Sequence, residues 1–102
     1  MASSGEEAVD IVREEPVHVA LLDMHLPRMS GLETLELVRQ INRVLPCILV
    51  TADASAELMR RAFTAHAYSV IPKPVSKHVV LYTVVRALVR TYDLTLDKRP
   101  EE

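Results

Sequence analysis

The chain of 102 residues has little of several residue types that mark particular classes of protein. Its single cysteine, Cys47, cannot form an internal disulfide, so a reducing, cytoplasmic location is expected. No apolar run approaches the ~20 residues of a membrane-spanning helix, and the first residues do not resemble a signal peptide. The 14 acidic and 12 basic residues are mixed, without a basic block or an aromatic-basic stripe. Neither nucleic acid nor a membrane is therefore expected as a direct partner.

Short apolar segments alternate along the chain with amphipathic ones. Ser30 and Glu33 have the spacing of a capping box at the start of a helix, and Pro16 and Pro46 end two predicted helices. Helices are predicted at residues 5–15, 31–45, 54–65 and 75–92, and strands at residues 17–23, 47–51 and 68–72. Apolar strands that alternate with helices are typical of a parallel sheet covered on both faces. The predicted fold class is therefore α/β, with three parallel strands and four helices.

A polar residue ends or follows each predicted strand. Asp23 closes the first strand, Thr51 closes the second, and Lys73 follows the third. Since parallel strands end at one edge of a sheet, the carboxylate, the hydroxyl and the ammonium are expected to point into one crevice. Taken singly, each residue has an ordinary explanation: a turn aspartate, a β-branched strand residue and a solvated lysine. Their coincidence at three successive strand ends favours a functional site.

This combination of side chains suits phosphoryl transfer. A carboxylate such as that of Asp23 can act as a nucleophile and form an acyl phosphate. A hydroxyl and an ammonium, here from Thr51 and Lys73, can stabilise charge on the phosphoryl oxygens. Mg²⁺ commonly accompanies such chemistry, because it binds carboxylate and phosphate oxygens.

Residues 21–33, with the sequence LLDMHLPRMSGLE, closely resemble the phospho-acceptor segment of response-regulator receiver domains. Val50-Thr51-Ala52 and Pro72-Lys73-Pro74 resemble the hydroxyl and lysine motifs of the same family. The resemblance implies a flavodoxin-like receiver fold in two-component signalling. It also implies a domain over residues 1–92, followed by a polar tail over residues 93–102.

The resemblance implies a role for each site residue. Asp23 is expected to accept a phosphoryl group from a sensor histidine kinase or a phosphotransfer protein. Thr51 and Lys73 would contact that group, and the backbone carbonyl of His25 would bind Mg²⁺ together with Asp23. His25 and Asp53 occupy positions that tune the loss of the phosphoryl group. The Lys73–Pro74 peptide bond is expected to be cis, which aims the lysine at the crevice.

Two features depart from the family pattern. This sequence shows no counterpart of the family's opening strand, first helix and second strand, which carry an acidic pair that binds Mg²⁺. We therefore expect Mg²⁺ binding to be weak or absent in this chain, and phosphorylation to be poor. The family's aromatic switch position is Val70 here. Tyr68 lies two residues earlier, and strand alternation places it on the same face as Val70.

Three classes of function remain at this stage. The leading one is a phosphorylatable signalling module, and the alternative is a degenerate receiver that works by dimerisation or docking without phosphorylation. An enzyme of the acyl-phosphate phosphatase type ranks low, because the Asp23-Met24-His25 sequence lacks a second acid. A homo-oligomer is also expected, since the apolar strand at residues 17–23 would lie on an exposed sheet edge.

Overall fold

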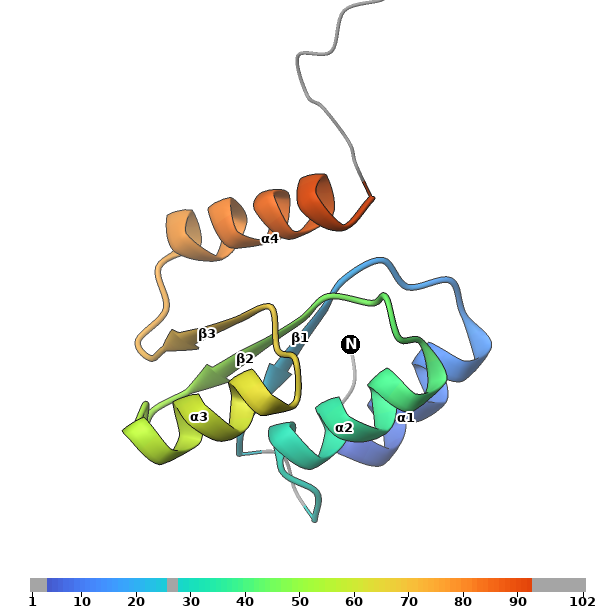
Figure 1. Ribbon diagram of the computed structural model, residues 1–102, viewed down its shortest axis with the longest axis horizontal. Helices are drawn as coiled ribbons and strands as arrows, with labels where there is room; N and C mark the ends of the chain where they lie inside the picture. Colours follow the sequence, from blue (N-terminus) through green and yellow to red (C-terminus); the bar gives the residue numbers. More distant parts are fainter. Residues whose placement is uncertain (1–3, 26–27, 93–102) are drawn as a thin grey trace, which may run out of the picture.

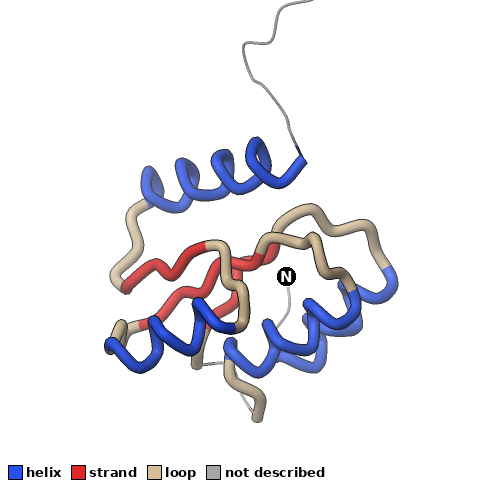
Figure 2. The backbone as a smooth tube through the Cα atoms, in the orientation of Figure 1, coloured by secondary structure: helices blue, strands red, loops and turns tan. Residues whose placement is uncertain are grey.

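The computed structural model describes residues 4–25 and 28–92 (Figure 1). Within these ranges helices and strands alternate in the order α1 (Gly5–Glu14), β1 (Ala20–Asp23), α2 (Gly31–Ile41), β2 (Cys47–Thr51), α3 (Ala56–Thr64), β3 (Ser69–Pro72) and α4 (Lys77–Tyr92). The sheet forms the middle layer, with α4 over one face and α1, α2 and α3 over the other (Figure 2). The predicted α/β class is confirmed. The predicted tail, residues 93–102, lies outside the described residues.

The three strands are parallel and lie in the order β1-β2-β3. Leu22 of β1 is opposite Leu49 of β2, and Leu49 is opposite Val70 of β3. Because the strands run in one direction, their carboxyl ends meet at one edge. Among the described residues, no helix is both long and apolar enough to pass through a bilayer.

Side-chain caps fix where three of the helices begin. The Ser30 hydroxyl accepts a hydrogen bond from the Glu33 N–H at 3.1 Å, and the Glu33 carboxylate accepts one from the Ser30 N–H at 2.9 Å. The capping box predicted at the start of α2 is therefore confirmed. Ser4 and Ser55 cap α1 and α3 through their hydroxyls. These caps satisfy backbone donors that have no partner inside the helix.

The larger part of the core lies between the sheet and α1, α2 and α3. It contains Leu22 and Leu49 from the strands and Leu35 and Val38 from α2, all fully or almost fully buried. Cys47 is also completely buried in this cluster, and burial raises the pKa of its thiol to about 11. The cysteine therefore packs in the core as a small apolar side chain.

Among the described residues, α4 alone covers the opposite face of the sheet (Figure 1). Ile48 and Ile71 of the sheet pack with Ala87 of α4 in a smaller apolar cluster. The Tyr92 hydroxyl donates to the backbone carbonyl of His18 at 2.8 Å, which ties the end of α4 to the segment before β1. This layer is thin, because Ala87 is the only fully buried residue of α4.

Two expectations about the strands are wrong. The first strand begins at Ala20 and not at residue 17, because Ala20 is already opposite Cys47, the first residue of β2. Tyr68 and Val70 do not share a face: Tyr68 packs with the cluster under α4, and Val70 packs with the larger cluster. The reason is that Tyr68 precedes β3, so strand alternation does not extend to it.

Candidate functional site

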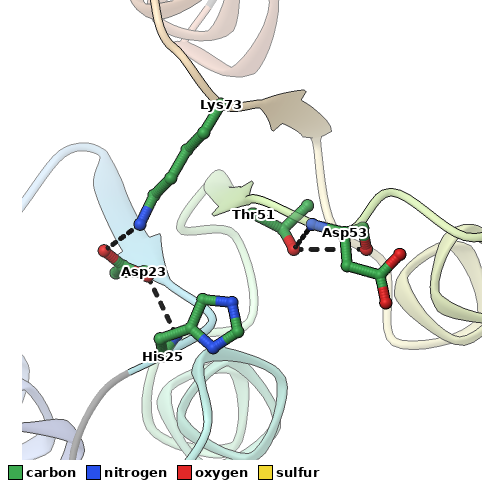
Figure 3. A network of polar contacts seen from close by, with 5 residues as sticks. All are labelled: Asp23, His25, Thr51, Asp53 and Lys73. Atoms are coloured by element: carbon green, nitrogen blue, oxygen red, sulfur yellow. Dashed lines mark hydrogen bonds and ion pairs between the residues drawn. The ribbon is translucent and has the colours of Figure 1, made fainter.

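Asp23 and Lys73 meet at the carboxyl edge of the sheet. The Lys73 ammonium donates to Oδ2 of Asp23 at 2.9 Å, across 50 residues of sequence. Figure 3 shows the lysine side chain reaching from the end of β3 toward the end of β1. The Lys73–Pro74 bond is cis, as predicted. Both side chains are partly exposed, at 35% for Lys73 and 42% for Asp23, so the pair is accessible from solvent.

The carboxylate of Asp23 has a second donor. The His25 backbone N–H donates to Oδ1 at 2.9 Å, which closes a local turn after β1. This hydrogen bond, and then the one from Lys73, hold the pKa of Asp23 below its ordinary value. Asp23 is therefore a carboxylate at neutral pH, which is the form that a nucleophile needs.

Thr51 lies at the same edge, but its hydroxyl points elsewhere. It donates to the Asp53 carbonyl at 3.3 Å and accepts from the Asp53 N–H at 3.0 Å, as Figure 3 shows. Asp23 is in register with Val50, one residue before Thr51, so alternation sends the Asp23 and Thr51 side chains to opposite faces. The structure brings Asp23 and Lys73 together and leaves the Thr51 hydroxyl in a local turn.

Gly31, the first residue of α2, lies against the backbone of Asp23, a contact that the sequence did not predict. A Cβ at this position would lie 2.7 Å from the backbone carbonyl oxygen of Asp23 and 2.9 Å from its carbonyl carbon. The first turn of α2 therefore packs directly against the backbone that carries the Asp23 side chain. The absence of a Cβ at Gly31 allows this close approach of the two backbone segments.

Comparisons with known proteins identify the family. The family described as response regulator receiver domain matches residues 1–85 of this chain. The chain belongs to the response regulator receiver family. It is a receiver domain of two-component phosphorelay signalling, and receiver domains are signalling modules.

Relatives and solved structures agree with this assignment. The transcriptional regulatory protein ZraR of Escherichia coli K12 is 29% identical over 92% of this chain, which spans 21% of ZraR. The sensor histidine kinase RcsC of the same strain is 31% identical over 81% of this chain, which spans 9% of RcsC. A CheY-like receiver domain protein of Methanospirillum hungatei JF-1 superposes with a TM-score of 0.84 at 29% identity. That match covers 88% of this chain and 72% of the other.

Mg²⁺ binds at the phosphorylation site of receiver domains, so its fit to this chain can be tested. Mg²⁺ requires near-octahedral oxygen coordination and uses one or two carboxylates with water and phosphate. Across residues 4–25 and 28–92, no three His, Cys, Asp or Glu side chains are grouped to hold a metal ion. Both oxygens of Asp23 already accept hydrogen bonds. The residues described here do not form a complete Mg²⁺ site.

We expect the 102-residue chain to bind Mg²⁺ weakly and to be phosphorylated slowly. A cation held by the Asp23 carboxylate and the His25 carbonyl keeps most of its water and gains little affinity. Titration calorimetry with MgCl₂ measures the first expectation, with Asp23→Asn as the control for site-specific heat. Stoichiometric, long-lived phosphorylation of Asp23 in this chain would contradict the second.

The Asp23 carboxylate is also expected to make the free energy of unfolding of the chain depend on pH. Its pKa is lower in the folded chain than the ordinary value of 3.8. The resulting stabilisation is therefore present above that value and is lost as the pH falls through the folded-state pKa. Urea unfolding should show that Asp23→Asn is less stable than the unmodified chain at pH 7, by a modest amount because the pair is exposed. A difference that persists unchanged at pH 2 would argue against this interpretation.

Proposed function

We propose that Asp23 accepts a phosphoryl group from a phosphohistidine and that this modification changes how the chain binds its partner. The observation that carries the proposal is the contact between Lys73 and Asp23 at the carboxyl edge of the sheet. Ligands of parallel α/β sheets bind outside this edge. The phosphohistidine belongs to a sensor histidine kinase or a phosphotransfer protein in the cytoplasm. We regard the chain as a signalling module and not as an enzyme.

The chemical step uses Asp23 and Lys73, which are already in contact. A carboxylate oxygen of Asp23 attacks phosphorus, the phosphorus–nitrogen bond of the phosphohistidine breaks, and its electron pair passes to the imidazole nitrogen. The Lys73 ammonium moves from the carboxylate to a phosphoryl oxygen, where it offsets the added negative charge. The Thr51 hydroxyl can turn toward the same group by giving up its 3.3 Å hydrogen bond to Asp53.

Phosphorylation by a small donor tests the proposal. The chain is incubated with acetyl phosphate and Mg²⁺, and the acyl phosphate is located by mass spectrometry after borohydride reduction. Slow labelling of Asp23 is expected, with none in Asp23→Asn. The matched control is Glu57→Gln, which removes an exposed carboxylate in the first turn of α3 and should retain labelling. Labelling that is equal in both variants would overturn the assignment of Asp23.

A degenerate receiver that is not phosphorylated is the second candidate. The observation that favours it is the lack of grouped metal ligands among residues 4–25 and 28–92. Under this alternative, Asp23 and Lys73 form a structural ion pair, and the chain acts by dimerisation or docking. A complete absence of acyl phosphate at high donor and Mg²⁺ concentrations would support it.

We also propose that the chain forms a homo-oligomer. In the described part of the chain, β1 pairs with β2 on one side and has no strand on the other, and Leu21 of β1 is 43% exposed. Unpaired backbone groups beside an apolar side chain favour pairing with another strand. Sedimentation velocity at micromolar concentration should show a dimer or larger species that Leu21→Lys shifts toward monomer. A compact monomer before substitution would contradict the proposal.

A further inference from the structure

The start of α1 packs tightly against the start of α2, and the two helices lie side by side (Figure 1). A Cβ at Gly5, the first residue of α1, would overlap Oγ1 of Thr34 and lie 2.9 Å from both Cβ and Sδ of Met29. Thr34 is completely buried, and its hydroxyl donates to the Ser30 carbonyl at 2.9 Å. We call this contact of Gly5, Met29 and Thr34 the seam. The thioether of Met29 is therefore part of the packing between the two helices.

The position of α1 depends on this seam. Within the described part of the chain, α2 is the element that α1 chiefly contacts. The buried residues of α1 are Gly5 in the seam and Ala8 and Val9, which belong to the larger apolar cluster. A change in the size or polarity of a side chain in the seam therefore acts on the position of the whole helix relative to α2.

Met29 is also joined to the phosphorylation site through the backbone. It precedes Ser30, which caps α2, and Gly31, whose N–H donates to the Met24 carbonyl at 3.3 Å. Gly31 packs directly against the backbone of Asp23. A shift of Met29 therefore reaches, within two residues, the segment that holds the Asp23 carboxylate in place.

The backbone just before Met29 has a disfavoured conformation. Arg28 has a φ of 65°, in the left-handed region that is uncommon for residues with a Cβ. Such a conformation persists where the surrounding contacts hold it. The packing of Met29 in the seam is one of these contacts, so loss of that packing allows the turn at Arg28 to relax.

We propose that Met29 is a redox-sensitive modification site, whose oxidation to the sulfoxide by a peroxide separates α1 from α2 and slows phosphorylation of Asp23; the second effect rests on the function proposed above. The Met29 sulfur attacks one oxygen of hydrogen peroxide, and the O–O bond breaks. The proton of the transferred oxygen passes to the departing hydroxide, which leaves as water. Sulfur loses two electrons, and these reduce the peroxide. The sulfoxide is bulkier and more polar than the thioether, and the seam has no room even for a Cβ at Gly5.

The other sulfur atoms of the described chain differ from that of Met29. Met29 is partly exposed, so a small oxidant reaches it. Cys47 is completely buried, which protects its thiol. Met59 is 45% exposed on α3, where solvent accommodates an added oxygen. Met24 packs against the larger apolar cluster and is the competing site that the experiment must separate from Met29.

Peroxide treatment of the unmodified chain and of single variants tests the proposal. Peptide mass spectrometry locates each sulfoxide after treatment with hydrogen peroxide. Oxidation should lower the melting temperature of the unmodified chain by about 4–8 °C and slow acetyl phosphate labelling about fivefold or more. It should also speed hydrogen exchange of the α1 amides, because α1 is no longer held against α2.

The leucine variants separate the methionines from one another. Met29→Leu keeps the apolar volume, so peroxide should change its melting temperature by less than about 2 °C and its labelling by less than about twofold. The matched controls are Met59→Leu and Met24→Leu, which remove a thioether elsewhere and should respond as the unmodified chain does. Met29→Gln places a polar group in the seam and should show the same losses without peroxide.

An unchanged melting temperature in a chain that carries Met29 sulfoxide would overturn the proposal, and so would protection by Met24→Leu in place of Met29→Leu. Full oxidation of Met59 without oxidation of Met29 would show that peroxide does not reach the seam. Methionine sulfoxide reductases of both stereospecificities should restore the melting temperature, and a loss that they do not reverse would mean damage and not a switch. If the untreated chain takes no phosphoryl group, the proposed function fails, and the melting and exchange measurements still decide whether the sulfoxide separates the helices.

Discussion

Replacing Gly31 with alanine is expected to lower the free energy of unfolding by roughly 1–3 kcal/mol, the range for overpacked positions. The new methyl group would lie 2.7 Å from the Asp23 carbonyl oxygen, and that neighbour is backbone, so it cannot move aside cheaply. Alanine is the better helix former by about 1 kcal/mol in helix interiors. That gain is smaller at the first residue of α2. The steric clash therefore outweighs it, and the substitution lowers the free energy of unfolding.

The same substitution is expected to reduce phosphorylation, because the backbone that shifts carries the Asp23 carboxylate. Urea unfolding and acetyl phosphate labelling measure the two effects. The matched control is Ala56→Ser, which also adds one heavy atom at the first residue of a helix, but at an exposed position of α3. If Gly31→Ala keeps both full stability and full labelling, the packing of α2 against Asp23 is unimportant.

Replacing Leu49 with alanine is expected to cost roughly 2–5 kcal/mol of unfolding free energy. Leu49 is completely buried in the centre of β2, where it contributes to the larger apolar cluster. A chain of this size has a total stability of about 5–15 kcal/mol, so the variant should be largely unfolded or melt far below the unmodified chain.

Leu81→Ala is the control for this effect, because the substitution is the same and Leu81 is 60% exposed on α4. Its loss should be below about 1 kcal/mol, since little apolar area returns to water. Circular dichroism melts of both variants measure the comparison. Similar losses in the two variants would mean that α4 packs against another surface, such as a second copy of the chain.

Most of the fold was predictable from local patterns. Ser30 marks the start of α2, and Pro46 precedes a strand whose predicted bounds match β2. The carboxyl edge also followed from pattern, because a parallel sheet brings Asp23 and Lys73 to the same side. These features depend on short-range chemistry and on one general property of parallel sheets.

The predictions that the structure does not support concern features that depend on strand register and on tertiary contacts. The direction of the Thr51 hydroxyl follows from the one-residue offset between Thr51 and Asp23, which no single segment encodes. Tyr68 lies on the face under α4 because β3 starts one residue later than predicted. The sequence showed no basic block, because Arg39, Arg61 and Arg90 lie in the last turns of three different helices.

Modification of the buried Cys47 thiol can be used to measure how often the core of the folded chain opens. Cys47 has no exposed surface, and its thiol has a pKa of about 11, so reagents that attack thiolates cannot reach or activate it in the closed state. Labelling therefore requires that β2 and the helices over it separate. The rate at which a thiol reagent modifies the unsubstituted chain then measures how often this core opens, and any ligand that binds the closed form will slow that reaction.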